Sequence, residues 1–238
     1  MTPAPAVAVK NLKTVMDKLT GEKPFAAYIE QTLLRPDATK DEVQKMINNA
    51  MEFHFYGVCI APYFVKYAKD IIKEDNLKII TVVGFPFGYQ TITAKVEEAK
   101  RTIQDGTDEI DMVMNIAAFK SKEYTYVKEE LDNLVTLCRL KNKILKVIVE
   151  TCLLSKDEII KACELCIEMQ VDFVKTSTGF NGEGAKIEIV KLMREMLPEK
   201  IKIKASGGIR QRKFAERLIS AGASRIGTSS GEALLKEK

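Results

Sequence analysis

Short apolar runs alternate with longer amphipathic stretches along most of this chain. Runs of about four to eight apolar residues suit buried strands, whereas apolar positions that recur every three to four residues indicate helices. The runs predict strands at 27–34, 56–61, 78–84, 109–114, 145–151, 173–178, 201–206 and 225–228.

Amphipathic segments separate these strands, and two of them have clear start signals. Thr39 and Ser155 each precede an acidic pair, as N-cap residues do. An additional segment at Val9–Leu19 predicts an extra N-terminal helix, and a short last helix is expected after Ser230. The other predicted helices lie near 41–53, 63–74, 91–105, 122–140, 156–169, 186–197 and 211–221.

Eight strands that alternate with helices at this spacing predict an α/β fold, a single (β/α)8 or TIM barrel. An open, doubly wound parallel sheet is the alternative that the same alternation allows. No glycine- or serine-rich linker interrupts the pattern. One domain is therefore expected to span residues 1–238.

The composition, with 46% hydrophobic and 29% charged residues, is typical of a globular protein with a buried core. No apolar run approaches the roughly 20 residues of a membrane helix, and the first residues lack the pattern of a secretion signal. We therefore expect a cytoplasmic protein without a membrane partner. The net charge of +4, from 37 basic and 33 acidic residues, is spread along the chain, which argues against nucleic acid and suits small anionic substrates.

Histidine is nearly absent, because His54 is the only one in the chain. A Ser-His-Asp triad and a metal site of several histidines are thereby excluded. His54 lies at a predicted helix-to-strand turn, where a packing or surface role is favoured over catalysis. Of the five cysteines, only Cys163 and Cys166 have a Cys-x-x-Cys spacing, and they lie inside a predicted amphipathic helix. Buried thiols are favoured there over a metal site.

Ionisable residues stand inside three predicted strands, near the ends where such barrels carry their active sites. Asp111 lies on the fourth strand, Lys175 on the sixth and Lys204 on the seventh. Because strand side chains alternate between faces, both lysines and the aspartate can share one cavity. Burial and like charge lower the pKa of a lysine, so one amine can be neutral and attack a carbonyl while the carboxylate relays protons. Ion pairs that only fill the barrel are the alternative, but two lysines with an aspartate favour catalysis.

Two further features follow later strands. Lys146 on the fifth strand, with Glu150 on the same face, is another candidate for the barrel interior. Glycine-rich turns follow the seventh strand at 206–208 and the eighth at 227–230. Barrels commonly bind phosphate at these turns through backbone N–H groups, so a phosphorylated substrate is expected.

Motifs that carry a family resemblance extend over nearly the whole chain. They are Gln31-Thr-Leu-Leu-Arg-Pro-Asp-Ala-Thr39, Val58-Cys-Ile-Ala-Pro62, Val83-Gly-Phe-Pro-Phe-Gly88, Asp108-Glu-Ile-Asp-Met-Val-Met-Asn-Ile116, Leu145-Lys-Val-Ile-Val-Glu-Thr151, Phe173-Val-Lys-Thr-Ser-Thr-Gly-Phe180 and Lys204-Ala-Ser-Gly-Gly-Ile-Arg210. In this order they resemble the motifs of the deoxyribose-phosphate aldolase family, from about Ala26 to Gly231.

The resemblance implies reversible cleavage of 2-deoxy-D-ribose 5-phosphate to D-glyceraldehyde 3-phosphate and acetaldehyde, in deoxynucleoside catabolism, without a metal or organic cofactor. It implies that Lys175 forms the imine, that Lys204 perturbs Lys175, and that Asp111 relays protons. It also implies a homodimer or homotetramer. The expected contacts to substrate and its phosphate are Gly179, Gly207, Gly208, Ser229, Ser230, Arg210, Thr32 and Cys59.

The chain departs from the family pattern at two places. Glu30-Gln31 replaces the usual Asp-His before Thr-Leu-Leu, and the extra methylene moves the carboxylate by about a bond length or more, which leaves a role for Glu30 open. Ala61 replaces a frequent asparagine near Cys59, a thiol for which plain burial competes with a role at the aldehyde site. Glu30 and Lys146 are therefore candidates for residues that contact the catalytic side chains without contacting the substrate.

Two other functions remain open at this point. Another lysine-imine aldolase for sugar phosphates would share the chemistry of Lys175 and prefer a longer donor. A barrel that binds phosphosugars without catalysis is suggested only by Glu30-Gln31, and the intact set of Lys175, Lys204 and Asp111 argues against it.

Overall fold

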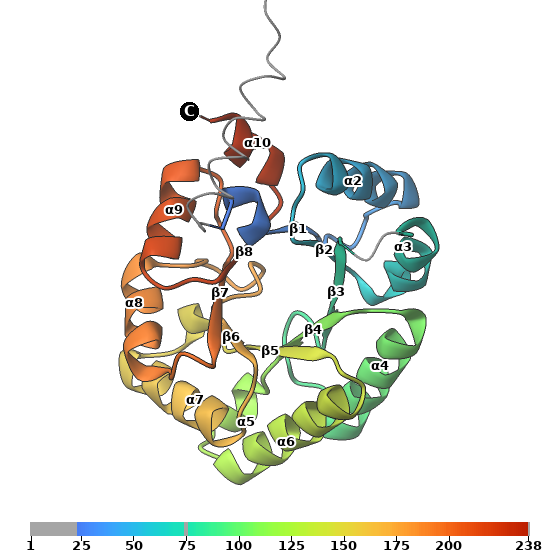
Figure 1. Cartoon of the computed structure of the whole chain (residues 1–238). Coiled ribbons are helices and arrows are strands. Elements are labelled where there is room, and N and C mark those ends of the chain that lie inside the picture. Colours follow the sequence, from blue (N-terminus) through green and yellow to red (C-terminus); the bar gives the residue numbers. More distant parts are fainter. Residues whose placement is uncertain (1–22, 74–75, 238) are drawn as a thin grey trace, which may run out of the picture.

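The computed structural model describes residues 23–73 and 76–237. Within these ranges the strands are parallel and close into a barrel in the order β1 to β8, with helices around the outside (Figure 1). The predicted (β/α)8 fold is confirmed, and the open sheet is excluded because β8 pairs with β1. The predicted N-terminal helix at Val9–Leu19 lies outside the described residues.

Every predicted strand is present in the described part of the chain. They are β1 (Ile29–Leu33), β2 (Gly57–Ile60), β3 (Lys78–Val83), β4 (Glu109–Val113), β5 (Ile144–Ile148), β6 (Phe173–Lys175), β7 (Lys202–Ser206) and β8 (Arg225–Thr228). Strands β5 and β6 end about three residues earlier than the apolar runs suggest. For β5, one reason is Glu150, whose left-handed backbone, with a φ of 54°, breaks the extended conformation.

The α-helices lie close to their predicted positions. They are α2 (Lys40–Glu52), α3 (Val65–Ile71), α4 (Ile92–Asp105), α5 (Ile116–Lys120), α6 (Tyr124–Leu140), α7 (Lys156–Glu168), α8 (Ile187–Met196), α9 (Arg212–Ser220) and α10 (Gly231–Lys236), with 3-10 turns at Phe25–Tyr28, Pro62–Phe64 and Thr151–Leu153. The sequence did not predict α5, which is only one turn long and lacks a clear repeat. None of the described helices combines the length and apolar character needed to cross a membrane.

The predicted N-caps at Thr39 and Ser155 are confirmed as complete capping boxes. The side chain of Thr39 accepts from Glu42 N at 3.3 Å, and Glu42 accepts in return from Thr39 N at 2.9 Å. Ser155 and Glu158 form the same pair of bonds. Each box satisfies N–H groups that the first turn of a helix otherwise leaves free, and so fixes where the helix begins.

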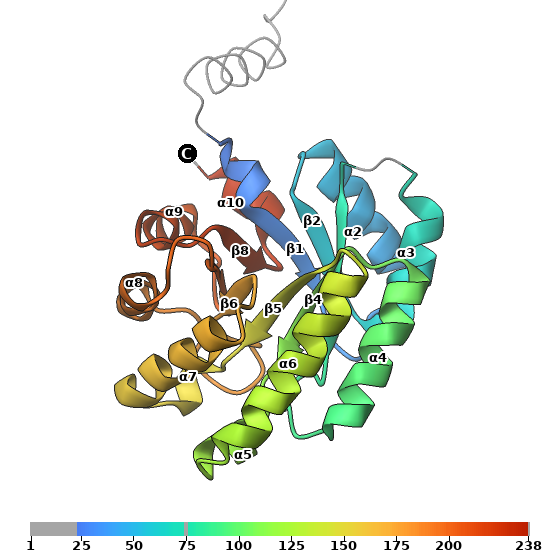
Figure 2. The same cartoon turned by 60° about the horizontal axis from the view of Figure 1, so that its bottom comes forward.

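Apolar side chains stabilise the barrel from outside. The main core lies between the outer face of the strands and the surrounding helices. Figure 2 shows these helices and strands from a second direction. Inside the barrel, a much smaller apolar cluster comes from β2 and β3 and consists of Cys59, Ile80 and Val82. Phe173 of β6 also faces the interior, beside Lys146. Much of the remaining interior holds charged residues that the strand register brings together. Lys175 lies opposite Lys204, and Asp111 lies opposite Lys146.

A buried ion pair outside the barrel holds the end of β4. Lys95 on α4 donates to Glu130 of α6 at 2.6 Å, to Gly88 O at 2.6 Å and to Val113 O at 2.7 Å. Glu130 also accepts from Asn115 N at 2.9 Å. Because both charges are fully buried, each depends on the other for compensation. The pair thus ties the β3–α4 loop to the strand that carries Asp111.

Replacing Lys95 with Met should lower the free energy of unfolding by about 3–5 kcal/mol, because Glu130 would remain buried without its cation. Urea denaturation measures this change. Lys100→Met is the matched control, since Lys100 is an exposed residue of the same helix; it should stay within about 0.5 kcal/mol of the unmodified protein. Equal stability of the two variants would contradict the role given to Lys95.

Candidate active site

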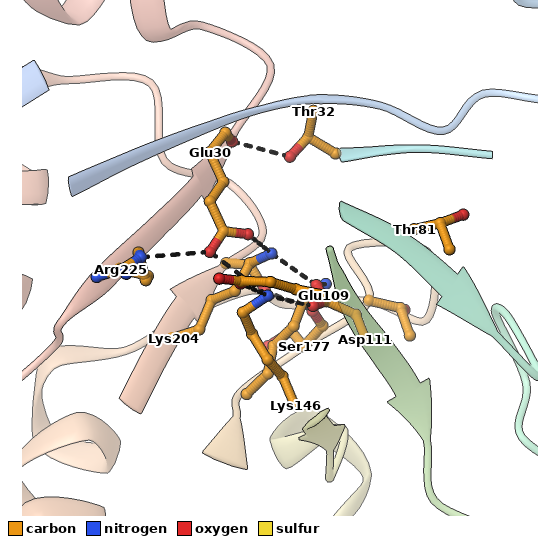
Figure 3. Close-up of polar contacts among 12 residues, drawn as sticks. Glu30, Thr32, Thr81, Glu109, Asp111, Lys146, Ser177, Lys204 and Arg225 are labelled. Atoms are coloured by element: carbon orange, nitrogen blue, oxygen red, sulfur yellow. Dashed lines mark hydrogen bonds and ion pairs between the residues drawn. The ribbon is translucent and has the colours of Figure 1, made fainter. Parts of the chain in front are cut away.

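One buried carboxylate joins three lysines inside the barrel. Asp111 accepts from Lys146 Nζ at 3.0 Å, from Lys175 Nζ at 2.8 Å and from Lys204 Nζ at 2.6 Å. The amines come from β5, β6 and β7, and Figure 3 shows Lys146 and Lys204 pointing toward Asp111. The three residues that the sequence predicted as catalytic, Lys175, Lys204 and Asp111, therefore meet at one point.

Two more carboxylates complete the set of charges. Glu30 of β1 contacts Lys204 Nζ directly, and its other oxygen lies 3.6 Å from Lys146 Nζ and 3.7 Å from Arg225 Nε. Glu109 of β4 pairs with Lys146 (Figure 3). The longer side chain of Glu30 thus reaches the amine of Lys204. We call the whole set the interior charge cluster; it consists of Glu30, Glu109, Asp111, Lys146, Lys175, Lys204 and Arg225.

Contacts between opposite charges determine which groups of this cluster are ionised. Burial alone would raise the pKa of Asp111, but Lys146, Lys175 and Lys204 hold it well below its ordinary value. Burial opposes the charged form of Lys146, yet Asp111, Glu30 and Glu109 raise its pKa well above the ordinary value. For Lys204, Asp111 and Glu30 likewise outweigh burial and raise the pKa. Two of the three amines are thus held as ammonium ions.

Lys175 differs from the other two amines in its access to open space. Lys146 and Lys204 are 0% exposed, whereas Lys175 lines a cavity of about 300 Å³. Among the described residues that line this cavity, Lys175 is the one that belongs to the interior charge cluster. A molecule in the cavity would therefore meet this amine first.

Most of the predicted phosphate contacts line the same cavity, namely Thr32, Gly179, Gly207, Gly208, Arg210 and Ser229. Two predicted contacts lie elsewhere. Ser230 lies in a separate surface hollow beside Gln31, and its N–H already donates to Thr228 Oγ1 at 2.9 Å. Cys59 is fully buried in the apolar interior cluster, where burial raises the pKa of its thiol. Neither residue presents a group to the cavity wall.

The loops after β6 and β7 touch backbone to backbone beside the cavity. A Cβ atom on Gly184 would lie 2.0 Å from Gly207 O, so only glycine fits there. Ala185 N donates to Ser206 O at 3.0 Å and to Gly207 O at 3.2 Å. Gly207 and Gly208 both have positive φ, and within the described residues neither donates its N–H to a protein acceptor. These N–H groups remain available to a ligand.

Gln31 holds the loop between β8 and α10 from the outer side of β1. Its Nε2 donates to Ser229 O at 3.0 Å, and its Oε1 accepts from Gly231 N at 2.9 Å. One amide therefore fixes both sides of Ser230, across about 200 residues of sequence. Ser229 lines the cavity, so the position of this wall depends on Gln31.

Glu150 does not share the face of Lys146, contrary to the sequence prediction. Strand β5 ends before it, and its positive φ turns the side chain out of the strand alternation. Its carboxylate accepts from Thr178 N at 3.2 Å and from Asn181 Nδ2 at 2.9 Å. Glu150 therefore anchors the β6–α8 loop and lies outside the interior charge cluster.

Sequence reasoning missed several residues of the cavity wall, including Arg35, Thr178 and Phe180. Arg35 pairs with Asp37 at 2.6 Å, and Phe180 packs edge-to-face on Phe85 with ring centres 5.2 Å apart. All three residues stand at or just after the end of a predicted strand. That position is the signal that could have found them.

Two minor expectations are confirmed. His54 lies in the turn before β2 with a φ of 55°, away from the cavity lining. Cys163 and Cys166 are buried thiols of α7, and burial raises the pKa of Cys163 to about 12. Neither thiol is placed to react at the cavity.

Residues 25–237 match the DeoC/LacD family of aldolases. The chain belongs to this family. It is 49% identical over 212 residues to a deoxyribose-phosphate aldolase of Thermococcus kodakarensis, covering 88% of this chain and 95% of the relative. A second deoxyribose-phosphate aldolase, of Caldicellulosiruptor saccharolyticus, is 48% identical over 217 residues, with 91% and 99% covered.

Solved structures of aldolases agree with this family assignment. The aldolase QR15 is 42% identical, with a TM-score of 0.84 over 88% of this chain and 93% of QR15. The deoxyribose phosphate aldolase of Aeropyrum pernix, described as a unique tetramer, is 29% identical, with a TM-score of 0.83 over 89% of each chain. The family resemblance inferred from the sequence motifs is confirmed.

Asp111→Asn should destabilise the protein in a pH-dependent way. Because the folded-state pKa of Asp111 is lowered, its ionisation stabilises the fold above the unfolded pKa, near 4, and this contribution is lost as pH falls through the folded pKa. The stability difference from the unmodified protein should be constant between about pH 5 and 8 and shrink below pH 4, by at most about 1.4 kcal/mol per pH unit. Urea denaturation at several pH values measures it. A difference that grows on acidification would contradict the ionised state of Asp111.

Proposed function

We propose that this aldolase cleaves 2-deoxy-D-ribose 5-phosphate reversibly, through an imine on Lys175. The observation that carries the proposal is the position of Lys175, which lines the cavity while its Nζ contacts Asp111 at 2.8 Å. Two relatives that are 49% and 48% identical and bear the name deoxyribose-phosphate aldolase support the choice of substrate. The products are D-glyceraldehyde 3-phosphate and acetaldehyde.

Lys175, in its neutral form, attacks the C1 aldehyde of the open-chain substrate, and loss of water gives an iminium. The iminium nitrogen then accepts the electron pair of the C2–C3 bond while a base takes the proton of the C3 hydroxyl. Glyceraldehyde 3-phosphate leaves, and an enamine stays on Lys175. Protonation of the enamine at C2 and hydrolysis by water release acetaldehyde and the free amine.

Asp111 and Lys204 are the proposed proton carriers. Their contact at 2.6 Å joins an ionised carboxylate to an ammonium ion, and Asp111 also contacts the reacting amine. A proton can therefore pass between Lys175, Asp111 and Lys204 with water as the exchange partner. The raised pKa of Lys204 keeps a positive charge on the amine that shares Asp111 with Lys175.

The opposite side of the cavity is proposed to hold the phosphate. Gly179, Gly207, Gly208 and Ser229 would offer backbone N–H groups, and Arg210 would add a positive charge. This arrangement fits a substrate whose aldehyde and phosphate are at opposite ends. A small phosphorylated sugar is the proposed partner, as the sequence suggested.

An aldolase with a longer, ketose donor would share the chemistry of Lys175. Analysis of the cleavage products separates this alternative from the proposed function. For the assembly we propose a homodimer or homotetramer, in line with the tetramer described for the Aeropyrum pernix relative.

The deciding experiment is reductive trapping. The protein is mixed with 2-deoxyribose 5-phosphate and sodium borohydride, and intact-mass spectrometry with peptide mapping locates the product. A two-carbon adduct on Lys175 is expected, because borohydride reduces the imine that remains after glyceraldehyde 3-phosphate leaves. Lys175→Ala should form no adduct and lose activity by about 10³-fold or more while it stays folded.

Lys202→Ala is the matched control for this experiment, because Lys202 is an exposed lysine on the neighbouring strand β7. It should trap the adduct and cleave the substrate at the unmodified rate. An adduct on a different lysine, or full activity in folded Lys175→Ala, would refute the assignment. No adduct with the unmodified protein would leave only phosphosugar binding.

Gln31→Ala tests the phosphate side of the cavity. Loss of both amide bonds should loosen the Ser229 loop and raise KM for 2-deoxyribose 5-phosphate about tenfold, with little change in kcat. Cleavage of unphosphorylated 2-deoxyribose should be unchanged, because it does not use this loop. Steady-state kinetics with the phosphorylated and the unphosphorylated sugar measure this difference, and Gln44→Ala on α2 is the control. An equal loss with both sugars would contradict phosphate binding at Ser229.

A further inference from the structure

The interior charge cluster continues past the reacting groups toward the opposite end of the barrel. Lys175 contacts Asp111 at 2.8 Å, and Asp111 contacts Lys146 at 3.0 Å. Lys146 then pairs with Glu109, which accepts from the hydroxyl of Tyr56. An unbroken chain of polar contacts thus runs from the cavity to the residue before β2, and the proposed mechanism uses only its first part.

The far end of this chain is tightly held. Glu109 is 1% exposed, so its carboxylate depends on Lys146 and Tyr56 for compensation. The guanidinium of Arg225 lies 3.5 Å from the centre of the Tyr56 ring and covers it. Burial, followed by the charge of Glu109, raises the pKa of Tyr56 to about 12, so its hydroxyl stays a donor at neutral pH.

The net charge of the interior charge cluster is zero in only one protonation state of Lys175. Glu30, Glu109 and Asp111 supply three negative charges, while Lys146, Lys204 and Arg225 supply three positive ones. A protonated Lys175 adds a fourth positive charge that no further carboxylate of the cluster compensates. The neutral form of the amine therefore gives a neutral interior, and each carboxylate counts in setting the pH at which that form appears.

We propose that Glu109, fixed by Tyr56, is a positioning residue that acts through Lys146 and Asp111 to set the pH range in which Lys175 can react. This inference rests on the proposed function, because it assumes that Lys175 is the attacking amine. It assigns a role to a carboxylate that lies beyond Lys146 and does not line the cavity.

Other ionisable groups lie near this part of the interior and are unchanged in Glu109→Gln. They are Lys23, Tyr56, Cys59, Arg225, the exposed Lys202 and Lys78, which is the register partner of Gly57. Of these, Lys23 has a pKa lowered to about 8, mainly by burial and then by Arg225 and Lys202. Glu30 and Glu109 raise this pKa, so Glu109→Gln should lower it further, and the acid limb below pH 7 is therefore the readout of the test.

Glu109→Gln tests the proposal, because it removes one negative charge and keeps the size of the side chain. With less negative charge nearby, Lys175 should lose its proton at lower pH, so the acid limb of kcat/KM should move down by about one pH unit. The plateau should also fall, because the iminium adds a positive charge. The measurement is kcat/KM for 2-deoxyribose 5-phosphate between pH 5 and 9, written as the ratio of variant to unmodified protein.

Glu130→Gln is the matched control, since Glu130 is a buried, ion-paired glutamate outside the barrel. Its ratio should be flat with pH even if its stability falls. Tyr56→Phe provides a second variant in case Glu109→Gln does not fold. It removes the donor that fixes Glu109, so its ratio should depend on pH in the same direction and less strongly.

The outcomes separate this inference from the proposed function. If the unmodified protein traps no adduct on Lys175, the proposed function fails regardless of Glu109. If it traps the adduct and the ratio for folded Glu109→Gln is flat with pH, like that for Glu130→Gln, the role of Glu109 is refuted. A ratio that rises as the pH falls supports it.

Discussion

Charge compensation in a buried space is the constraint on which this structure depends. A carboxylate or an ammonium ion away from water is costly unless an opposite charge and hydrogen bonds replace the water. Asp111 meets this condition for three amines at once. Glu30 meets it for Arg225 and adds a second partner for Lys204, while Glu109 adds one for Lys146. Among the described residues, ion pairs therefore fill much of the barrel interior, beside the apolar cluster of β2 and β3 and the ring of Phe173 on β6.

The residues that stabilise the fold and the residues that can act on a substrate therefore lie in different parts of the barrel. The large apolar core lies between the strands and the helices, so the fold does not need apolar residues inside the barrel. The interior can then hold groups whose net contribution to stability is small but whose charges act on a substrate. The Lys95–Glu130 pair joins the two regions, because it lies in the outer layer and fixes the end of the strand that carries Asp111.

The sequence predicted the barrel and its three central residues because their signals are local. Apolar runs mark strands, and Asp111, Lys175 and Lys204 stand inside such runs on faces that strand alternation can direct into one cavity. Glu109 and Tyr56 were not singled out, since their roles depend on a contact across 53 residues that no local pattern records. Glu150 was placed on the wrong face because alternation was extended past the end of β5, where a left-handed residue breaks it. The positions of Ser230 and Cys59 relative to the cavity likewise depend on packing between distant segments.

The contact between Gly184 and Gly207 has a mechanical consequence. Because the two backbones touch and Ala185 bonds to both Ser206 and Gly207, the loops after β6 and β7 form one rigid unit and do not move independently. Glu150 ties the first of these loops to β5 through Thr178 and Asn181. A displacement of either loop by a ligand is thereby transmitted to β5, β6 and β7, each of which carries one of the amines that surround Asp111.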